Sequence, residues 1–249
     1  MHAMNQKGFT LLEIMIALTI GVFLTGALLT IVQTNRRVFG EQSQLAQMQD
    51  NQRMALTMVG DVIQSAGYFP NPVVNTSTTA LIAAGPFAVG QSISGTTAPP
   101  FDTISVRYMT AGGDGILNCS GGSNPTGNPN FVYVNTFSVL NGQLICTRED
   151  GTQYTLVGGT TAPPSGLDIT GMSILYGVRA DPTQPGNNVD TYMSAAQVNG
   201  ATLWGSVISV QIQLTFTNPL YNAANPGLQP QTFQISRVIG VMSQTGPTI

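Results

Sequence analysis

The sequence predicts an α+β fold in which one long N-terminal helix packs on a mainly antiparallel β-sheet domain. Three observations support this prediction. An apolar segment without proline covers residues 9–32, and an amphipathic helical pattern follows over residues 33–67. Short alternating segments separated by turn residues then fill residues 68–249. The chain has 249 residues, a length that suits one domain or two small ones.

The apolar segment at residues 9–32 predicts a transmembrane helix. In helical form it would measure about 36 Å, and a bilayer core is about 30 Å thick. Gly21 and Gly26 lie inside it, where a membrane helix tolerates glycine better than a soluble helix does. The segment contains one charged residue, Glu13.

Three kinds of segment have this length and composition. A secretory signal peptide has an apolar core of about 7–15 residues, which is shorter than this one, and a small-residue cleavage site that is missing here. A plain membrane anchor would gain nothing from Glu13, since a carboxylate inside a membrane helix costs about 2.5–3.5 kcal/mol. The third is a leader that is cut before the apolar stretch, which would free an amine as a partner for Glu13.

The residues around this junction resemble the class III prepilin leader of type IV pilin-like proteins. They read Gly8, Phe9, Thr10, Leu11, Leu12 and Glu13. The resemblance implies that residues 1–8 are a cleaved leader, with the cut between Gly8 and Phe9 and N-methylation of Phe9. It also implies that Glu13 sets the register of assembly. The start at Met1 or Met4 stays open, and Arg36 and Arg37 run against the usual cytoplasmic placement of positive residues.

The segment at residues 33–67 predicts an amphipathic continuation of the same helix. Its apolar side chains recur at spacings of three and four. They are Leu45, Met48, Ala55, Leu56, Val59, Val62, Ile63 and Ala66. Gly67 is the expected C-cap, because Pro70 follows closely and glycine adopts the left-handed backbone that ends helices.

The remaining residues, 68–249, predict a β-rich extracytoplasmic domain with long loops. Alternating segments predict strands at residues 103–109, 131–140, 143–148, 153–157, 172–179, 206–217 and 232–241. Asn141 and Gly142 form a hairpin-turn signal between two of these segments. The stretches 74–100 and 111–130 are rich in Gly, Pro, Ser, Thr and Asn, so we expect surface loops there.

The two cysteines, Cys119 and Cys146, allow two interpretations. In an exported domain an even pair predicts a disulfide, which would tie the loop at 111–130 to the far strand of the Asn-Gly hairpin. The alternative is a pair of reduced, buried thiols.

Two longer stretches are similar to the PilW family of minor pilins: residues 51–69, and residues 166–198 followed by Trp204 and the strand at 206–217. The resemblance implies a minor pilin in the bacterial inner membrane. It would have its globular domain in the periplasm and would prime type IV pilus assembly, in a tip complex, for twitching motility. Its partners would be other minor and major pilins, the prepilin peptidase and a tip adhesin. Two alternatives stay open: a GspJ-like pseudopilin of type II secretion, and a pilus-displayed adhesin or DNA-uptake subunit.

Composition argues against several other functions. The only histidine, His2, lies in the leader, so the mature chain has no imidazole for general-base catalysis, and we expect neither an enzyme nor a cofactor. A net charge of −3 gives no broad basic field, so no nucleic-acid partner is expected. No metal site is expected, although Asp181, Asn187 and Asp190 form a weak calcium candidate because calcium prefers oxygen ligands.

Overall fold

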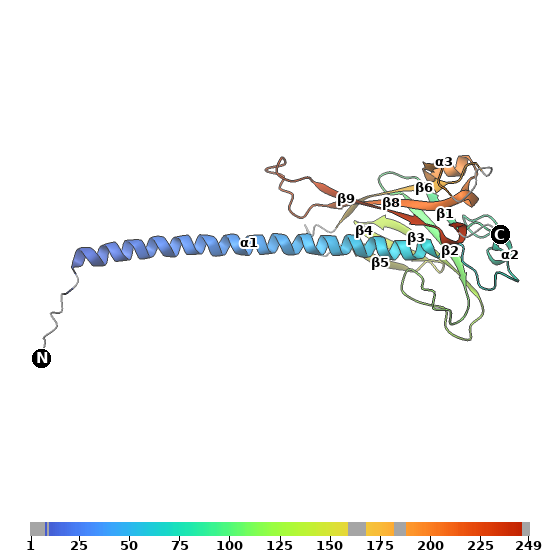
Figure 1. Ribbon diagram of the computed structural model, residues 1–249, viewed down its shortest axis with the longest axis horizontal. Coiled ribbons are helices and arrows are strands. Elements are labelled where there is room, and N and C mark those ends of the chain that lie inside the picture. The colour runs from blue at the N-terminus through green and yellow to red at the C-terminus, as the bar shows by residue number, and fades with distance from the viewer. Residues whose placement is uncertain (1–7, 9, 159–167, 182–187, 246–249) are drawn as a thin grey trace. The chain divides into compact units, whose positions relative to one another are not determined.

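The computed structural model describes residues 8, 10–158, 168–181 and 188–245 (Figure 1). The chain divides into two units, residues 1–46 and residues 47–249. The first consists, in its described part, of the N-terminal portion of one long helix. The second contains the rest of that helix and all of the described strands. The predicted α+β class, a long apolar helix with antiparallel sheets, is confirmed.

The long helix α1 runs without interruption from Leu11 to Gln64. Among the described residues it is the one helix long and apolar enough to cross a membrane. None of its apolar window is buried by the residues that the structure describes. Phe9, the first residue of the predicted span, lies outside the described residues.

In the second unit, α1 buries one face in the domain core. The buried residues are Met48, Gln52, Ala55, Leu56, Val59, Gly60, Val62 and Ile63. This set contains most of the predicted apolar stripe. The helix ends at Gln64, three residues before the predicted Gly67, because residues 65–67 form turns. Gly67 has a φ of +76°, and its N–H donates to the carbonyl of Arg107 at 3.0 Å.

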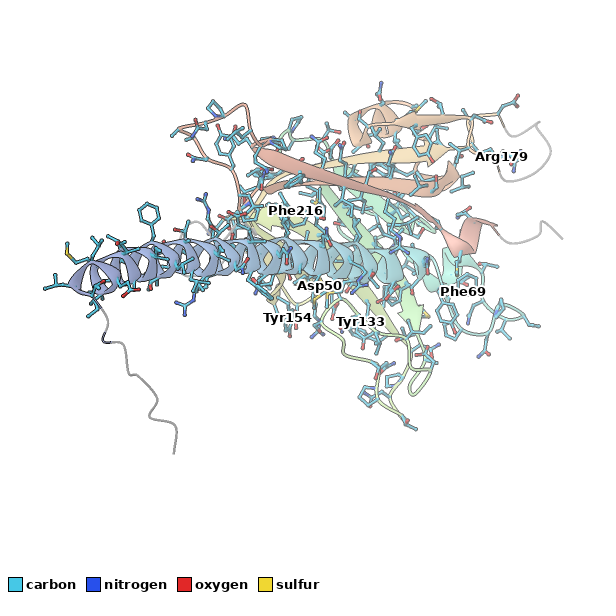
Figure 2. The ribbon with its side chains drawn as sticks, turned by 60° about the vertical axis from the view of Figure 1, so that its left-hand side comes forward. Asp50, Phe69, Tyr133, Tyr154, Arg179 and Phe216 are labelled. Carbon is cyan, nitrogen blue, oxygen red and sulfur yellow. A yellow bond between two sulfur atoms is a disulfide. The ribbon has the colours of Figure 1, made fainter. Side chains whose placement is uncertain are left out.

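The first sheet has five antiparallel strands in chain order. They are β1 (Ile93–Thr96), β2 (Thr103–Thr110), β3 (Phe131–Leu140), β4 (Gln143–Arg148) and β5 (Gln153–Gly158). The β3–β4 turn is the predicted one, since Asn141 and Gly142 both have positive φ, at 51° and 73°. In Figure 2, Tyr133 and Tyr154 mark β3 and β5.

The second sheet has four antiparallel strands in the order β7-β6-β8-β9. They are β6 (Ile169–Val178), β7 (Thr191–Met193), β8 (Val207–Thr217) and β9 (Thr232–Gly240). The inward side chains of β8, among them Val210, Ile212, Leu214 and Phe216, are almost completely buried. They share one core cluster with α1 and with the first sheet.

Asp102 connects the two sheets. Its Oδ1 accepts a hydrogen bond from Ala98 N at 2.9 Å, and its Oδ2 accepts one from Ile174 N in β6 at 2.9 Å. Its own N–H donates to the carbonyl of Met172, so the start of β2 lies against β6. Asp102 is buried, and each carboxylate oxygen has a partner, as burial of a charged group requires.

Several short elements were not predicted from the sequence. The stretch 74–100 contains α2 (Ser77–Ala80) and β1, and residues 181–206 contain β7, α3 (Ala195–Gly200) and the 3-10 turn η1 (Trp204–Ser206). A last helical turn, α4, spans Met242–Thr245. The stretch 111–130 has no regular element, but the buried side chains of Asn118 and Asn124 bond to its backbone.

The predicted disulfide between Cys119 and Cys146 is confirmed. It ties the 111–130 loop to β4, which is the far strand of the Asn-Gly hairpin. Both cysteines are buried, and the loop is also bonded to β3, because Cys119 N–H donates to Asn135 Oδ1 at 2.9 Å.

Candidate processing and assembly site

The start of α1 holds the residues that the sequence predicted to be functional. Gly8 is exposed, Phe9 lies outside the described residues, and Thr10 directly precedes the helix. The side-chain Oε2 of Glu13 accepts hydrogen bonds from Thr10 N at 3.1 Å and from Thr10 Oγ1 at 3.2 Å. Glu13 N in turn donates to Thr10 Oγ1 at 3.3 Å. Thr10 and Glu13 therefore form a capping box at the first turn.

The capping role of Thr10 was not predicted from the sequence. The signal was present, because a Thr followed three residues later by Glu, ahead of an apolar run, is the pattern of a capping box. The capping box fixes the direction of the Glu13 carboxylate. It also places a negative charge at the helix N-terminus, where the helix dipole favours it.

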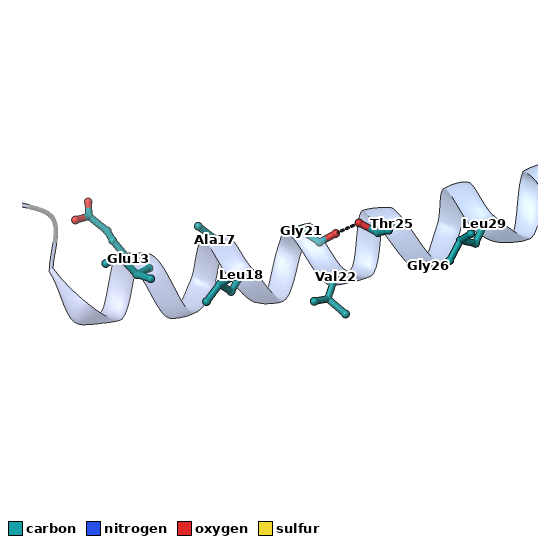
Figure 3. A pocket seen from close by; sticks show the side chains of 9 residues that line it. Glu13, Ala17, Leu18, Gly21, Val22, Thr25, Gly26 and Leu29 are labelled. Carbon is teal, nitrogen blue, oxygen red and sulfur yellow. Dashed lines mark hydrogen bonds between the residues drawn. The ribbon is translucent and has the colours of Figure 1, made fainter.

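A strip along the next four turns of α1 is concave and almost entirely apolar (Figure 3). Beyond Glu13 it is lined by Ile14, Ala17, Leu18, Gly21, Val22, Thr25, Gly26 and Leu29. Small residues lower the surface at its centre, which lets the backbone of another helix approach closely in a membrane. The strip is thus suited to helix–helix contact, with one carboxylate at its N-terminal end.

The hydroxyl groups in the apolar half of α1 are satisfied within the helix. Thr25 Oγ1 donates to the carbonyl of Gly21 at 2.7 Å, as Figure 3 shows, and Thr30 Oγ1 to that of Gly26 at 3.0 Å. Thr19 makes the same kind of bond to Met15 O at 2.6 Å. Because no water is available in a bilayer core, such internal bonds keep the threonines compatible with lipid.

Charged residues return after the apolar half of the helix. Arg37 Nε lies 3.0 Å from Glu41 Oε1, one turn further along, and both side chains are exposed. An exposed pair of this kind contributes little to stability. Asp50 and Arg53 form a second exposed pair in the second unit.

The calcium candidate is only partly described. Asp190 Oδ2 accepts hydrogen bonds from Ala180 N at 2.8 Å and Asp181 N at 3.0 Å, so this carboxylate orders the turn after β6. Asn187 lies outside the described residues. No group of three His, Cys, Asp or Glu side chains suited to a metal occurs in the described ranges. The calcium hypothesis therefore remains a prediction.

Two family models match the chain. The prokaryotic N-terminal methylation motif matches residues 3–29, which include Gly8, Phe9 and Glu13. The model of type IV pilus-assembly protein W matches residues 132–243, from β3 to α4. No curated protein sequence matches the chain. Among solved structures, a type IV-like pilin from Thermus thermophilus is similar at 11% identity and a TM-score of 0.46, over 79% of this chain and 96% of that one.

The two matched regions contain the features built up above. The methylation motif covers the capping box and the apolar strip of α1, and the second model covers most of both sheets. The chain matches the PilW family of type IV pilus assembly proteins over residues 132–243, and its N-terminus carries the prokaryotic methylation motif.

Proposed function

We propose that this protein is a minor pilin that primes type IV pilus assembly in a tip complex with other minor pilins. Assembly into a pilus implies pilin partners, and the leader motif implies processing by a peptidase. The observation that carries the proposal is the first turn of α1, where the carboxylate of Glu13 stands at the head of an apolar strip shaped for another helix. This role is structural and requires no enzymatic activity.

These features suggest an order of steps for processing and assembly of the chain. Residues 1–8 are removed between Gly8 and Phe9, and the new amine of Phe9 is methylated. Residues 9–32 then hold the chain in the inner membrane, with residues 33–67 and the β-rich domain of residues 68–249 on the periplasmic side. Glu13 next pairs with the N-terminal amine of a neighbouring pilin, because a carboxylate in an apolar environment is strongly stabilised by an opposite charge. The Ile14–Leu29 strip packs on that neighbour's helix.

A deletion strain tests the role in the pilus. We expect loss of surface pili and of twitching, with secretion of exoproteins unchanged, and recovery when the wild-type gene is supplied. Tagged full-length protein should copurify other minor pilins from detergent extracts. Lost secretion with intact pili would instead identify a pseudopilin, which was the open alternative. Normal pili that merely fail to adhere or to take up DNA would assign the protein to pilus display.

The tip placement has its own test. Gold-labelled antibody against the β-rich domain should mark one end of sheared pili at about one site per filament. Labelling along the whole filament would contradict the tip complex while leaving the assembly function in place.

A further inference from the structure

A groove lies at the C-terminal end of α1, inside the second unit, and no contact described above uses it. It has a volume of about 680 Å³. Its apolar lining comes from Tyr68, Phe69, Pro70, Pro72, Ile116 and Met242. In Figure 2, Phe69 lies at the end of α1, beside the strands of the domain. Asp61, Gln64, Asn71 and Ser243 supply its polar edge.

The walls of the groove are fixed by hydrogen bonds to the domain core. Met109 N–H donates to the carbonyl of Tyr68 at 2.8 Å, and Ser243 Oγ donates to that of Ala66 at 2.7 Å. Asn75 Nδ2 holds the carbonyl of Pro70 at 3.0 Å. A Cβ on Gly67 would meet Ser243 Oγ, so glycine is required where the two walls meet. A groove that is already formed loses little conformational entropy when it binds.

The groove has few charged residues. Asp61 is exposed, and among the described residues the hydrogen bonds that it accepts go to its backbone carbonyl, while its carboxylate is in none of the ion pairs. After Asp61, residues 62–101 contain no charged side chain at all. Asp61 is the one charged residue among those that line the groove, and the carboxylate of Asp114 lies next to the lining, since its Oδ1 accepts a hydrogen bond from Ile116 N at 3.1 Å. Exposed apolar side chains continue beside it at Val73 and Val74, which are 97% and 82% exposed.

We propose that this groove binds a segment of a partner protein that presents large apolar side chains next to a Lys or Arg. The apolar side chains fill the space between Tyr68 and Met242, and the cation pairs with Asp61. Charge complementarity favours this occupant, because a negative group would be repelled by Asp61, whereas a cation gains the modest attraction of an exposed ion pair. An anionic lipid surface is disfavoured for the same reason. The proposal holds wherever in the pilus the subunit sits.

Binding of defined peptides to the full-length protein in a non-ionic detergent tests the proposal. One fluorescent peptide places two leucines beside two arginines, and a matched peptide carries glutamines in place of the arginines. The arginine peptide should bind more tightly and should lose affinity as salt is added. D61N should weaken the arginine peptide about two- to fivefold, as expected for one exposed ion pair, and should leave the glutamine peptide unchanged.

Matched variants locate the binding. D50N removes the same charge from the same helix, away from the groove, and should not change the affinity. Tyr68→Ala removes an exposed wall and should weaken both peptides. A photoreactive group on the arginine peptide should crosslink to residues 61–72 or 242–243.

Four results would overturn the proposal: equal losses in D61N and D50N, equal affinity for both peptides, crosslinks elsewhere, or no binding at millimolar peptide. A fifth would replace the occupant, namely self-association of the full-length protein that D61N abolishes, because the groove would then bind a second copy.

Discussion

Glu13 combines two properties that substitution can separate. Its side chain accepts hydrogen bonds from Thr10, and it carries the only charge of the apolar segment. Glu13→Gln keeps an acceptor at the third helical position, which a capping box allows, but removes the charge. Glu13→Ala removes both. If the charge pairs with a neighbour's amine, both variants should be cleaved and inserted yet fail to enter pili.

The measurement is the amount of each variant in sheared pili, compared with the processed protein that remains in the membrane. A Glu13→Gln variant that assembles as well as wild type, beside a defective Glu13→Ala variant, would show that the helix cap matters and the charge does not. Failure of cleavage in either variant would mean that the peptidase also depends on this residue.

Arg107 is the largest fully buried side chain of the domain, at 1% exposure. It lies on β2, and its guanidinium donates to the carbonyls of Leu81, Ile82, Ala88 and Gln91. It also stacks over Phe87, with Cζ 4.7 Å from the ring centre. Burial lowers the pKa of Arg107, because desolvation disfavours its charged form. One side chain thus holds the loop between α2 and β1.

Arg107→Met should leave these carbonyls without donors and destabilise the domain by about 2–4 kcal/mol. Thermal unfolding in detergent, followed by circular dichroism, measures the loss. Arg107→Lys should be intermediate, since Lys keeps the charge but lacks the planar fork that reaches several acceptors. A Lys variant as stable as wild type would mean that the charge, rather than the fork, orders the loop.

Sequence reasoning identified Glu13 and missed Arg107 for a physical reason. Glu13 interrupts an apolar run, so the sequence itself shows that the charge is unusual. Arg107 alternates with the buried Val106 and Tyr108 on β2, and alternation predicts a solvent-facing side chain. The loop that covers it comes from residues 81–91, and that contact is not visible as a local pattern.

The helices and strands differ in the same way: those with a clear local pattern were predicted, and the others were missed. Strands β3 and β4 match the predicted bounds, because a strong turn separates two clear runs. Strand β1 has four residues and β7 has three, too short to show alternation. Helix α3 begins with a capping box between Ser194 and Gln197, which is a readable signal, yet its six residues follow a stretch that predicted only a turn.

The disulfide should stabilise the first sheet measurably. It closes a loop with a sequence separation of 27, for which chain entropy gives about 3.5 kcal/mol. Replacing both cysteines by alanine should therefore lower the midpoint of thermal unfolding. Reductant should lower the wild-type midpoint in the same way and leave the double variant unchanged. A double variant with the wild-type midpoint would show that the loop is held by its hydrogen bonds alone.

Alanine substitutions at two hairpin glycines distinguish the cost of backbone strain from the cost of steric crowding. Gly142 and Gly151 both have positive φ, at 73° and 81°, so alanine is strained at either position. A Cβ on Gly142 would also lie 3.1 Å from Asp168, whereas a Cβ on Gly151 would meet nothing within 4 Å. Gly151→Ala should cost about 1 kcal/mol. Gly142→Ala should cost more in the same unfolding measurement, and equal losses would exclude a contribution from Asp168.

At the scale of the whole molecule, two buried tyrosines make the free energy of unfolding depend on pH in the alkaline range. Burial raises the pKa of Tyr108 and of Tyr176 above the ordinary value of 10.0, and the nearby Asp102 adds to the effect at Tyr176. The native state therefore keeps these protons after the unfolded state has lost them. Their stabilisation is complete below about pH 10 and declines as the pH rises above it, by up to about 1.4 kcal/mol per pH unit for each tyrosine.

Denaturation at pH 9, 10 and 11 measures this dependence. Tyr176→Phe should reduce the slope above pH 10. Because Tyr108 belongs to the first sheet and Tyr176 to the second, Tyr108→Phe and Tyr176→Phe should each change one common transition. Separate transitions for the two sheets would show that the Asp102 connection does not couple their unfolding.

The bond between Cys119 and Cys146 also limits how far the chain can be drawn out. If the chain is pulled, as its proposed place in a pilus implies, an unfolding domain releases chain length. The sequence separation across the bond is 27, so about 90 Å of extended backbone stays out of the line of force while the bond is intact. The oxidised chain is therefore the shorter tether, and all of β3 and the start of β4 lie within the withheld length.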